Sequence, residues 1–257
     1  MNFANKIVVL TGASSGIGYQ LAKLLPKEHC PLALIARRKN ILDELVQELS
    51  IEYNQVKAYR CDVGKIDEVQ YTFEEIKKDF GRIDITILNA GISSRADIKE
   101  YSSAQAKKIF EINTLGIVNC IEKVLSDFME QKNGMIVGVT SLAESRGFPK
   151  SGFYNASKSA ASLLLESLRI ELKPYNIKVI TVKPGFVRTP MTDKNKFHMP
   201  FLMDVEKAAK IIISGIKKEK KIIQFPLPTV IGAKMFKIMP NWLFDRLMSK
   251  ELPHRRN

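Results

Sequence analysis

Residues 7–18 read IVVLTGASSGIG, an apolar run that leads directly into a glycine-rich loop. The run at 7–10 has the length and branched side chains of a buried strand. Glycines let the following loop turn tightly, let its backbone N–H groups approach a pyrophosphate, and let the next helix pack close to the strand. The glycine spacing is Gly-x-x-x-Gly-x-Gly, not Gly-x-Gly-x-x-Gly. This stretch predicts a dinucleotide-binding β-α unit at the start of the fold.

Short apolar runs alternate with amphipathic stretches along the rest of the chain. The expected strands are 6–11, 32–37, 56–60, 84–89, 134–140, 177–183 and 221–225. The expected helices are 17–27, 40–50, 66–80, 103–131, 154–173 and 205–218, the last of them capped by Asp204. This order predicts an α/β fold, a Rossmann-type doubly wound parallel sheet of about seven strands with helices on both faces. We expect a single domain over 1–257, with an apolar C-terminal extension from about 225.

Composition narrows the class of protein. The chain has 257 residues, of which 45% are hydrophobic, and its three cysteines (Cys30, Cys61 and Cys120) show neither disulfide nor metal-ligand spacing. We therefore expect buried thiols and no metal site. The N-terminus does not resemble a signal peptide and no apolar run is long enough to span a bilayer, so a cytoplasmic location is the expectation.

The formal net charge of +13 leaves two interpretations open. Solvated lysines on helix faces explain it, and so does attraction to an anionic surface. Much of the excess lies in clusters at 194–196, 217–218, 220–221 and 255–256, without aromatic residues at a stacking spacing. No nucleic-acid motif accompanies these clusters, so nucleic acid is not an expected partner.

The end of the second predicted strand bears on cofactor choice. Arg37 and Arg38 stand where an acidic residue would bind the ribose hydroxyls of NAD. An arginine there favours the 2′-phosphate of NADP(H) instead, through charge-assisted hydrogen bonds, and Ser14 offers a hydroxyl to the same phosphate. Asp62, after the third strand, is a candidate acceptor for the adenine amine or a turn aspartate.

Tyr154 and Lys158 are four residues apart on a predicted helix, so the phenol and the ammonium share one face. The positive charge favours the phenolate and is expected to lower the pKa of Tyr154. Ser141, thirteen residues before the tyrosine, belongs to another segment. Its hydroxyl can polarise the oxygen that exchanges a proton with the phenol. The three residues predict a general acid/base site.

Together these motifs resemble the short-chain dehydrogenase/reductase family, in its smaller single-domain branch, over about residues 5–225. The resemblance rests on the glycine loop, Asp62-Val63, Asn89-Ala90-Gly91, Asn113, Ser141, Tyr154-x-x-x-Lys158 and Pro184-Gly185-x-x-x-Thr189, in the family's order and spacing.

The resemblance implies a role for each matched residue. Tyr154 looks like the general acid/base, Lys158 like the group that lowers its pKa and holds the nicotinamide ribose, and Ser141 like the group that orients the substrate oxygen. Asn113 resembles the residue that holds a water against the lysine. The implied cofactor-binding set is Gly12, Ser14, Ser15, Gly16, Ile17, Gly18, Arg37, Arg38, Asp62, Val63, Asn89, Ala90, Gly91, Tyr154, Lys158, Pro184, Gly185, Val187 and Thr189.

The variable parts leave the substrate open. Apolar residues in the loop 186–203 suggest either an apolar carbonyl or alcohol substrate, or packing under a lid or at a subunit contact. The apolar tail 225–252 is a cap, a subunit contact, a lid over the pocket beside that loop, or a contact with a membrane surface. Two functions compete: an NADP(H)-dependent oxidoreductase, and a non-catalytic binding protein of the same fold. A homodimer or homotetramer built on 103–131 and 154–173 is also expected.

Overall fold

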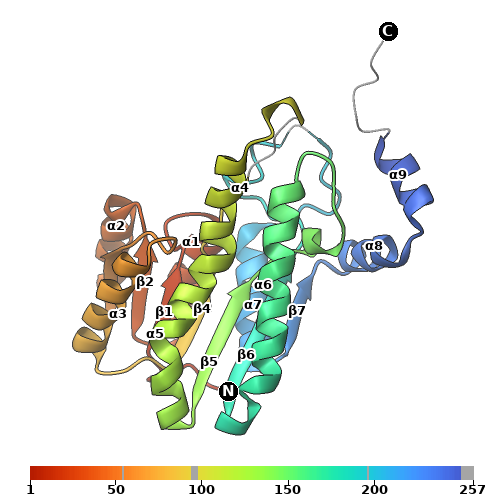
Figure 1. The fold of residues 1–257 in the computed structure, drawn as a ribbon. Helices are drawn as coiled ribbons and strands as arrows, with labels where there is room; N and C mark the ends of the chain where they lie inside the picture. Colours follow the sequence, from red (N-terminus) through yellow and green to blue (C-terminus); the bar gives the residue numbers. More distant parts are fainter. Residues whose placement is uncertain (54, 94–97, 196, 250–257) are drawn as a thin grey trace.

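Seven parallel strands form the centre of the molecule in a computed structural model that describes residues 1–53, 55–93, 98–195 and 197–249. The strands are β1 (Val8–Thr11), β2 (Leu32–Ala36), β3 (Val56–Arg60), β4 (Ile85–Leu88), β5 (Gly134–Val139), β6 (Ile177–Pro184) and β7 (Ile222–Phe225). Their order in the sheet is β3-β2-β1-β4-β5-β6-β7 (Figure 1). The predicted fold class and all seven predicted strands are confirmed.

Helices cover both faces of the sheet. On one face pack α1 (Gly16–Leu24), α2 (Lys39–Ser50) and α7 (Val205–Lys217). On the other pack α3 (Ile66–Phe80), α5 (Gly116–Gln131) and α6 (Gly152–Glu171). As predicted, Asp204 caps α7, since its carboxylate accepts hydrogen bonds from the backbone N–H groups of Glu206 and Lys207. No helix in these described ranges has the length and apolar character needed to cross a bilayer.

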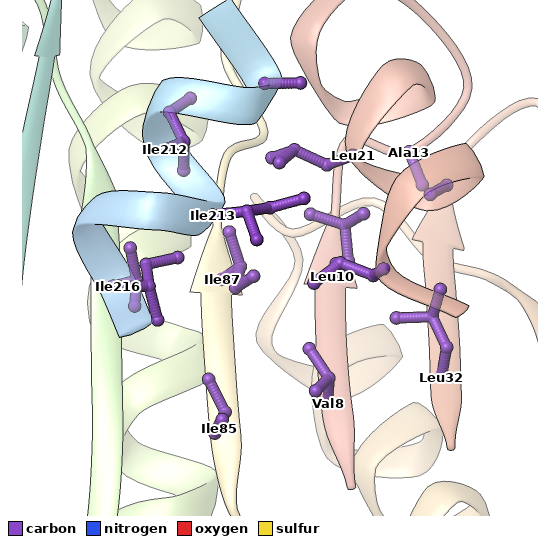
Figure 2. Packing of buried hydrophobic residues seen from close by; sticks show 14 of the residues in the cluster. Val8, Leu10, Ala13, Leu21, Leu32, Ile85, Ile87, Ile212, Ile213 and Ile216 are labelled. Carbon is purple, nitrogen blue, oxygen red and sulfur yellow. The ribbon is translucent and has the colours of Figure 1, made fainter. Parts of the chain in front are cut away.

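Strand β1 shows why several of the strands are almost continuously apolar. Val8 and Leu10 point into the core beneath α1 and α7, as Figure 2 shows, whereas Val9 packs in the core on the opposite face. Side chains alternate along a strand, so burial of both faces favours apolar residues at nearly every position. The cysteines are also buried and free, and burial raises the pKa of Cys30 to about 12 and that of Cys61 to about 11.

Chain order around β1 places the functional cleft. The chain runs outward from β1 to β2 and β3, then returns to β4 on the other side of β1. Loops that leave the carboxyl ends of β1 and β4 therefore diverge, and they open a crevice between them. The glycine loop leaves β1 at this point.

One predicted helix needs correction, and the tail adds two more helices. The stretch 103–131 is not one helix, because a π-helical turn at Glu111–Leu115 separates α4 (Ser103–Phe110) from α5. The tail, for which no secondary structure is predicted from the sequence, forms α8 (Leu227–Ile238) and α9 (Asn241–Ser249) beyond the β7 edge of the sheet (Figure 1). Lys196, Arg255 and Arg256 of the basic clusters, and the end of the tail, lie outside the described residues.

Candidate active site

The glycine loop is shaped by close backbone contacts. Gly12 has φ +70°, and a Cβ there would lie 2.8 Å from the Cα of Ala90. A Cβ on Gly18 would collide with the Gly12 carbonyl, so α1 packs against the loop only without a side chain at that position. Helix α1 begins without a side-chain cap and without an acidic residue in its first turn. Its free N–H groups and positive dipole end suit a pyrophosphate.

Asn89 joins the ends of the two strands that border the crevice. Its Nδ2 donates to the carbonyl oxygens of Thr11, at 3.2 Å, and Gly12, at 3.3 Å. The Thr11 hydroxyl in turn accepts from the backbone N–H groups of Asn89 and Ala90, each at 3.1 Å. These bonds fix the glycine loop against the end of β4.

The two arginines after β2 have different partners. Arg38 donates from Nε and Nη2 to the hydroxyl of Ser14, at 3.2 and 3.1 Å, and from Nη2 to the Ser14 carbonyl. Arg37 instead lies 3.7 Å from the Asp62 carboxylate, which also accepts from the N–H of Gly64. Asp62 therefore serves as a turn aspartate and as an ion-pair partner at the rim of the crevice.

Three catalytic candidates converge at the end of β5. Ser141 follows this strand, and its hydroxyl accepts from the N–H of Ala143 at 3.1 Å. Tyr154 and Lys158 come from the first part of α6, with the phenol hydrogen-bonded to Ser141. Lys158 is 3% exposed, and its ammonium donates to the carbonyl oxygen of Val139 at 2.9 Å. Segments distant in the sequence thus meet at one point.

Asn113 lies behind this group, in the π-helical turn. Its side chain is fully buried and bonds both backbone groups of Ile92, accepting from N–H at 2.8 Å and donating to the carbonyl at 3.0 Å. Its Nδ2 also donates to Ser157 Oγ. A Cβ on Gly91 would lie 3.1 Å from Lys158 Nζ and 3.3 Å from Asn113 Oδ1. Both polar atoms therefore border the small space that a glycine at position 91 leaves open.

The expected lowering of the Tyr154 pKa is wrong for this arrangement. Burial raises the pKa of the Tyr154 phenol, the hydrogen bond to Ser141 opposes the rise, and the Glu144 carboxylate adds to it. Burial likewise lowers the pKa of Lys158 to about 8, against the opposing effect of Glu144. The ammonium is directed at the carbonyl oxygen of Val139, and loss of water is the largest effect on the pKa of both groups.

Most of the predicted residues line one cavity of about 680 Å³. They are Gly12, Ser14, Ser15, Gly16, Ile17, Arg37, Arg38, Asp62, Val63, Asn89, Ala90, Gly91, Ser141, Tyr154, Lys158, Pro184, Gly185, Val187 and Thr189. Gly18 and Asn113 are the exceptions: Gly18 lies under the loop and Asn113 behind Gly91.

Apolar side chains wall the other half of the same cavity. The loop after β6 contributes Met191, Phe197 and Phe201, and the tail contributes Phe236 and Met248. The rings of Phe148, Phe236 and Phe244 pack edge to face, with each pair of centroids 5.9 Å apart. The tail therefore borders the cavity together with the loop 186–203, as the lid, one of the four interpretations of the tail, requires.

Glu144 is a residue of this site that the sequence did not reveal. Its Oε1 accepts from Ser162 Oγ at 2.8 Å and from Lys183 Nζ, and its backbone carbonyl accepts from Ser159 Oγ at 2.7 Å. The carboxylate thereby links the turn after Ser141 to α6 and to β6. A lysine within the apolar run of β6 is the one sequence signal for a buried partner.

Comparison with known proteins agrees with this geometry. The family model described as short chain dehydrogenase matches residues 6–199. An oxidoreductase of Myxococcus xanthus is 32% identical over 93% of this chain and 95% of its own length. A short-chain dehydrogenase/reductase from Burkholderia phymatum, solved with NAD, has a TM-score of 0.84 at 22% identity, covering 91% of this chain and 94% of its own. A Sphingobium yanoikuyae short-chain dehydrogenase in complex with NADPH has a TM-score of 0.80 at 25% identity, covering 92% and 97%.

Proposed function

Because the chain belongs to the short-chain dehydrogenase family, we propose that it is an NADP(H)-dependent oxidoreductase that interconverts an apolar carbonyl compound and its alcohol. The observation that carries this proposal is a single cavity in which the glycine loop, Ser141, Tyr154, Lys158 and an apolar wall meet. A non-catalytic role for the same fold does not require the acid/base residues to converge on the cavity.

The proposed chemistry divides between cofactor and protein. The bound nicotinamide supplies or accepts the hydride. In reduction, the Tyr154 hydroxyl donates its proton to the carbonyl oxygen, which the Ser141 hydroxyl orients. The raised pKa of the phenol keeps it protonated at neutral pH, which suits reduction. Lys158 holds the nicotinamide ribose, and its position beside the space at Gly91 suits a water-mediated proton path past Asn113.

The choice of NADP(H) rests on the contact between Arg38 and Ser14. Two donors of the Arg38 guanidinium hold the Ser14 hydroxyl at the rim of the cavity, beside the carboxyl end of β2. A 2′-phosphate bound there would receive charge-assisted hydrogen bonds from Arg38 and one from Ser14. Arg37 is paired with Asp62 and would contribute less to binding of the 2′-phosphate.

Assembly through α5 and α6 also belongs to the proposal. Leu115, Leu163 and Ile170 are exposed large apolar side chains on or next to these helices. Their burial against a second copy would give the homodimer or homotetramer expected from the sequence. Light scattering that returns the 29.0 kDa monomer at micromolar concentration would contradict this part.

Turnover of a substrate panel tests the function directly. The purified protein is offered NADPH and a series of aldehydes and ketones of increasing apolar size, and the loss of NADPH absorbance is followed. We expect turnover that rises with apolar size and that is lost in Tyr154→Phe. Tight NADPH binding without turnover of any carbonyl or alcohol would favour the non-catalytic role.

A further inference from the structure

Helix α8 carries a second apolar face that points away from the cavity. Leu227, Ile231 and Ile238 recur at spacings of four and seven residues, with Met235 beside them, and all four side chains are exposed. We call these four residues the outer stripe. The opposite side of α8 carries Thr229, Gly232, Ala233 and Phe236, which line the cavity. Among the residues that the structure describes, only the cavity side of α8 is covered, and the outer stripe is left exposed.

The outer stripe cannot turn inward, because the tail is anchored. Arg146 donates from Nη1 to the carbonyl of Met239 and from Nη2 to Asn241 Oδ1, each at 3.0 Å. Its guanidinium also lies 4.3 Å from the centroid of the Phe244 ring. These contacts, with the packing of Phe236 against Phe148, fix the rotation of α8. No other segment of the described residues covers the outer stripe, so it is open to a partner from outside the described part of the chain.

The charges around the stripe indicate which partner fits. Residues 227–249 contain the basic residues Lys234, Lys237 and Arg246 and one acidic residue, Asp245. Lys234 follows Ile231 by three positions and precedes Ile238 by four, so the helical repeat places it on the stripe itself. Trp242, at the start of α9, is 68% exposed. Exposed apolar residues, a tryptophan and flanking basic residues are the combination that binds the surface of an anionic bilayer.

A second copy of the chain fits this face less well. In a two-fold contact the same patch faces itself, so the Lys234 side chains of the two copies would approach each other. Anionic headgroups would instead neutralise them. We propose that α8 and α9 dock the protein on an anionic membrane surface, with the outer stripe and Trp242 in the headgroup region.

Docking in this orientation brings lipid next to the apolar half of the cavity, because Phe236 and Met248 lie on the same two helices (Figure 1). Resting on the proposed function, the inference extends to substrate: an apolar carbonyl compound dissolved in the membrane would enter between the loop 186–203 and α8. The docking itself does not depend on catalysis and is measured without turnover.

Trp242 gives a direct readout, because it is the only tryptophan in the chain. The full-length protein is mixed with vesicles of phosphatidylcholine alone or with phosphatidylglycerol added. With the anionic vesicles we expect tryptophan emission to move to shorter wavelength and to be quenched by lipids brominated in the acyl chain. We expect neither change with phosphatidylcholine alone, and a weaker response at high salt.

Matched variants locate the contact. Ile238→Asp should weaken vesicle binding roughly tenfold or more. Ile51→Asp is its control, because Ile51 is equally exposed, at 84%, beyond the end of α2. Lys234→Gln with Lys237→Gln should weaken binding more than Lys218→Gln with Lys220→Gln, which lie at the other end of β7 and remove the same charge.

Three results would overturn the proposal: unchanged Trp242 emission with anionic vesicles, equal loss of binding in Ile51→Asp, or an Ile238→Asp variant whose only effect is to dissociate an oligomer. Failure of the proposed function would give a different result: the protein would still bind anionic vesicles but would turn over no carbonyl compound. Conversely, if docking fails, reduction of a water-soluble carbonyl by wild-type protein would remain.

Discussion

The two halves of the cavity are built in different ways. In the cofactor half, backbone segments approach so closely that side chains are excluded, as at Gly12 and Gly18, and polar groups such as Asn89 are fixed by specific hydrogen bonds. In the substrate half, the wall is a set of apolar side chains from a loop and from α8 and α9. The first construction dictates residue identity, whereas the second requires only apolar surface. Substitutions in the cofactor half, and at Ser141, Tyr154 and Lys158 between the halves, should therefore reduce cofactor binding or activity more than substitutions in the substrate half.

The largest effect on activity is expected at Tyr154, where the cofactor half and the substrate half of the cavity meet. Tyr154→Phe should lower kcat roughly a thousandfold, because it removes the proton donor and leaves the ring in place. The dissociation constant for NADPH should stay within about twofold. Stopped-flow turnover and cofactor fluorescence measure the two quantities, and Tyr175→Phe is the control for a phenol outside the cavity. Retention of more than a few per cent of activity would remove Tyr154 from its proposed role.

The same phenol should set the pH dependence. Reduction needs the protonated phenol, and burial raises the pKa of Tyr154. Reduction should therefore be fully present at neutral pH and lost as pH rises through that raised pKa, while alcohol oxidation increases over the same range. A reduction rate that falls already between weakly acidic and neutral pH would contradict this assignment.

A variant of Glu144 tests the ion pair with Lys183, which links the turn after Ser141 to β6. Glu144→Gln should lower the free energy of unfolding by about 3 kcal/mol, because Lys183 would remain buried without its counter-charge. The side chains are only 12% and 17% exposed, so solvent screens the pair weakly. Adding Lys183→Met should recover much of that loss, and chemical denaturation of the four proteins in the cycle measures the coupling. Additive losses would show that the two residues act independently.

Arg38 tests the cofactor half alone. Arg38→Ala should weaken NADPH binding tenfold or more and leave NADH binding nearly unchanged, since a charge-assisted bond to phosphate contributes about 1.5–3 kcal/mol. Arg37→Ala, whose side chain faces Asp62, is the matched control and should have a smaller effect. Wild-type protein that binds both cofactors equally would contradict the NADP(H) assignment.

Phe236 tests the substrate half, where the smallest effect is expected. Phe236→Ala opens the aromatic group formed with Phe148 and Phe244 and should raise KM for an apolar carbonyl several-fold, in keeping with about 1 kcal/mol of lost contact. NADPH affinity should not change. An equal loss for both ligands would mean that the tail supports the whole cavity and not its apolar half.

The contrast between the halves also explains what the sequence predicted. The central strands followed from apolar runs buried on both faces, and the cofactor half from glycines such as Gly12 and Gly18, whose positions tolerate no side chain. The π-helical turn at Asn113 depends on hydrogen bonds to Ile92 and Ser157, which are not local in sequence. The Glu144–Lys183 pair joins segments 39 residues apart. The spacing of Tyr154 and Lys158 along the helix predicts a lowered pKa for Tyr154, whereas burial, which the spacing does not reveal, raises it.

Isotope transfer tests the central claim, that the two halves serve one hydride transfer, most directly. NADPH labelled with deuterium at the transferable position of the nicotinamide is incubated with the protein and an apolar ketone, and the product is analysed by mass spectrometry. The account predicts alcohol carrying one deuterium for each NADPH consumed in wild-type protein, and no alcohol with Tyr154→Phe. Deuterated alcohol formed equally by the Tyr154→Phe variant, or none formed by wild-type protein from any carbonyl tested, would contradict it.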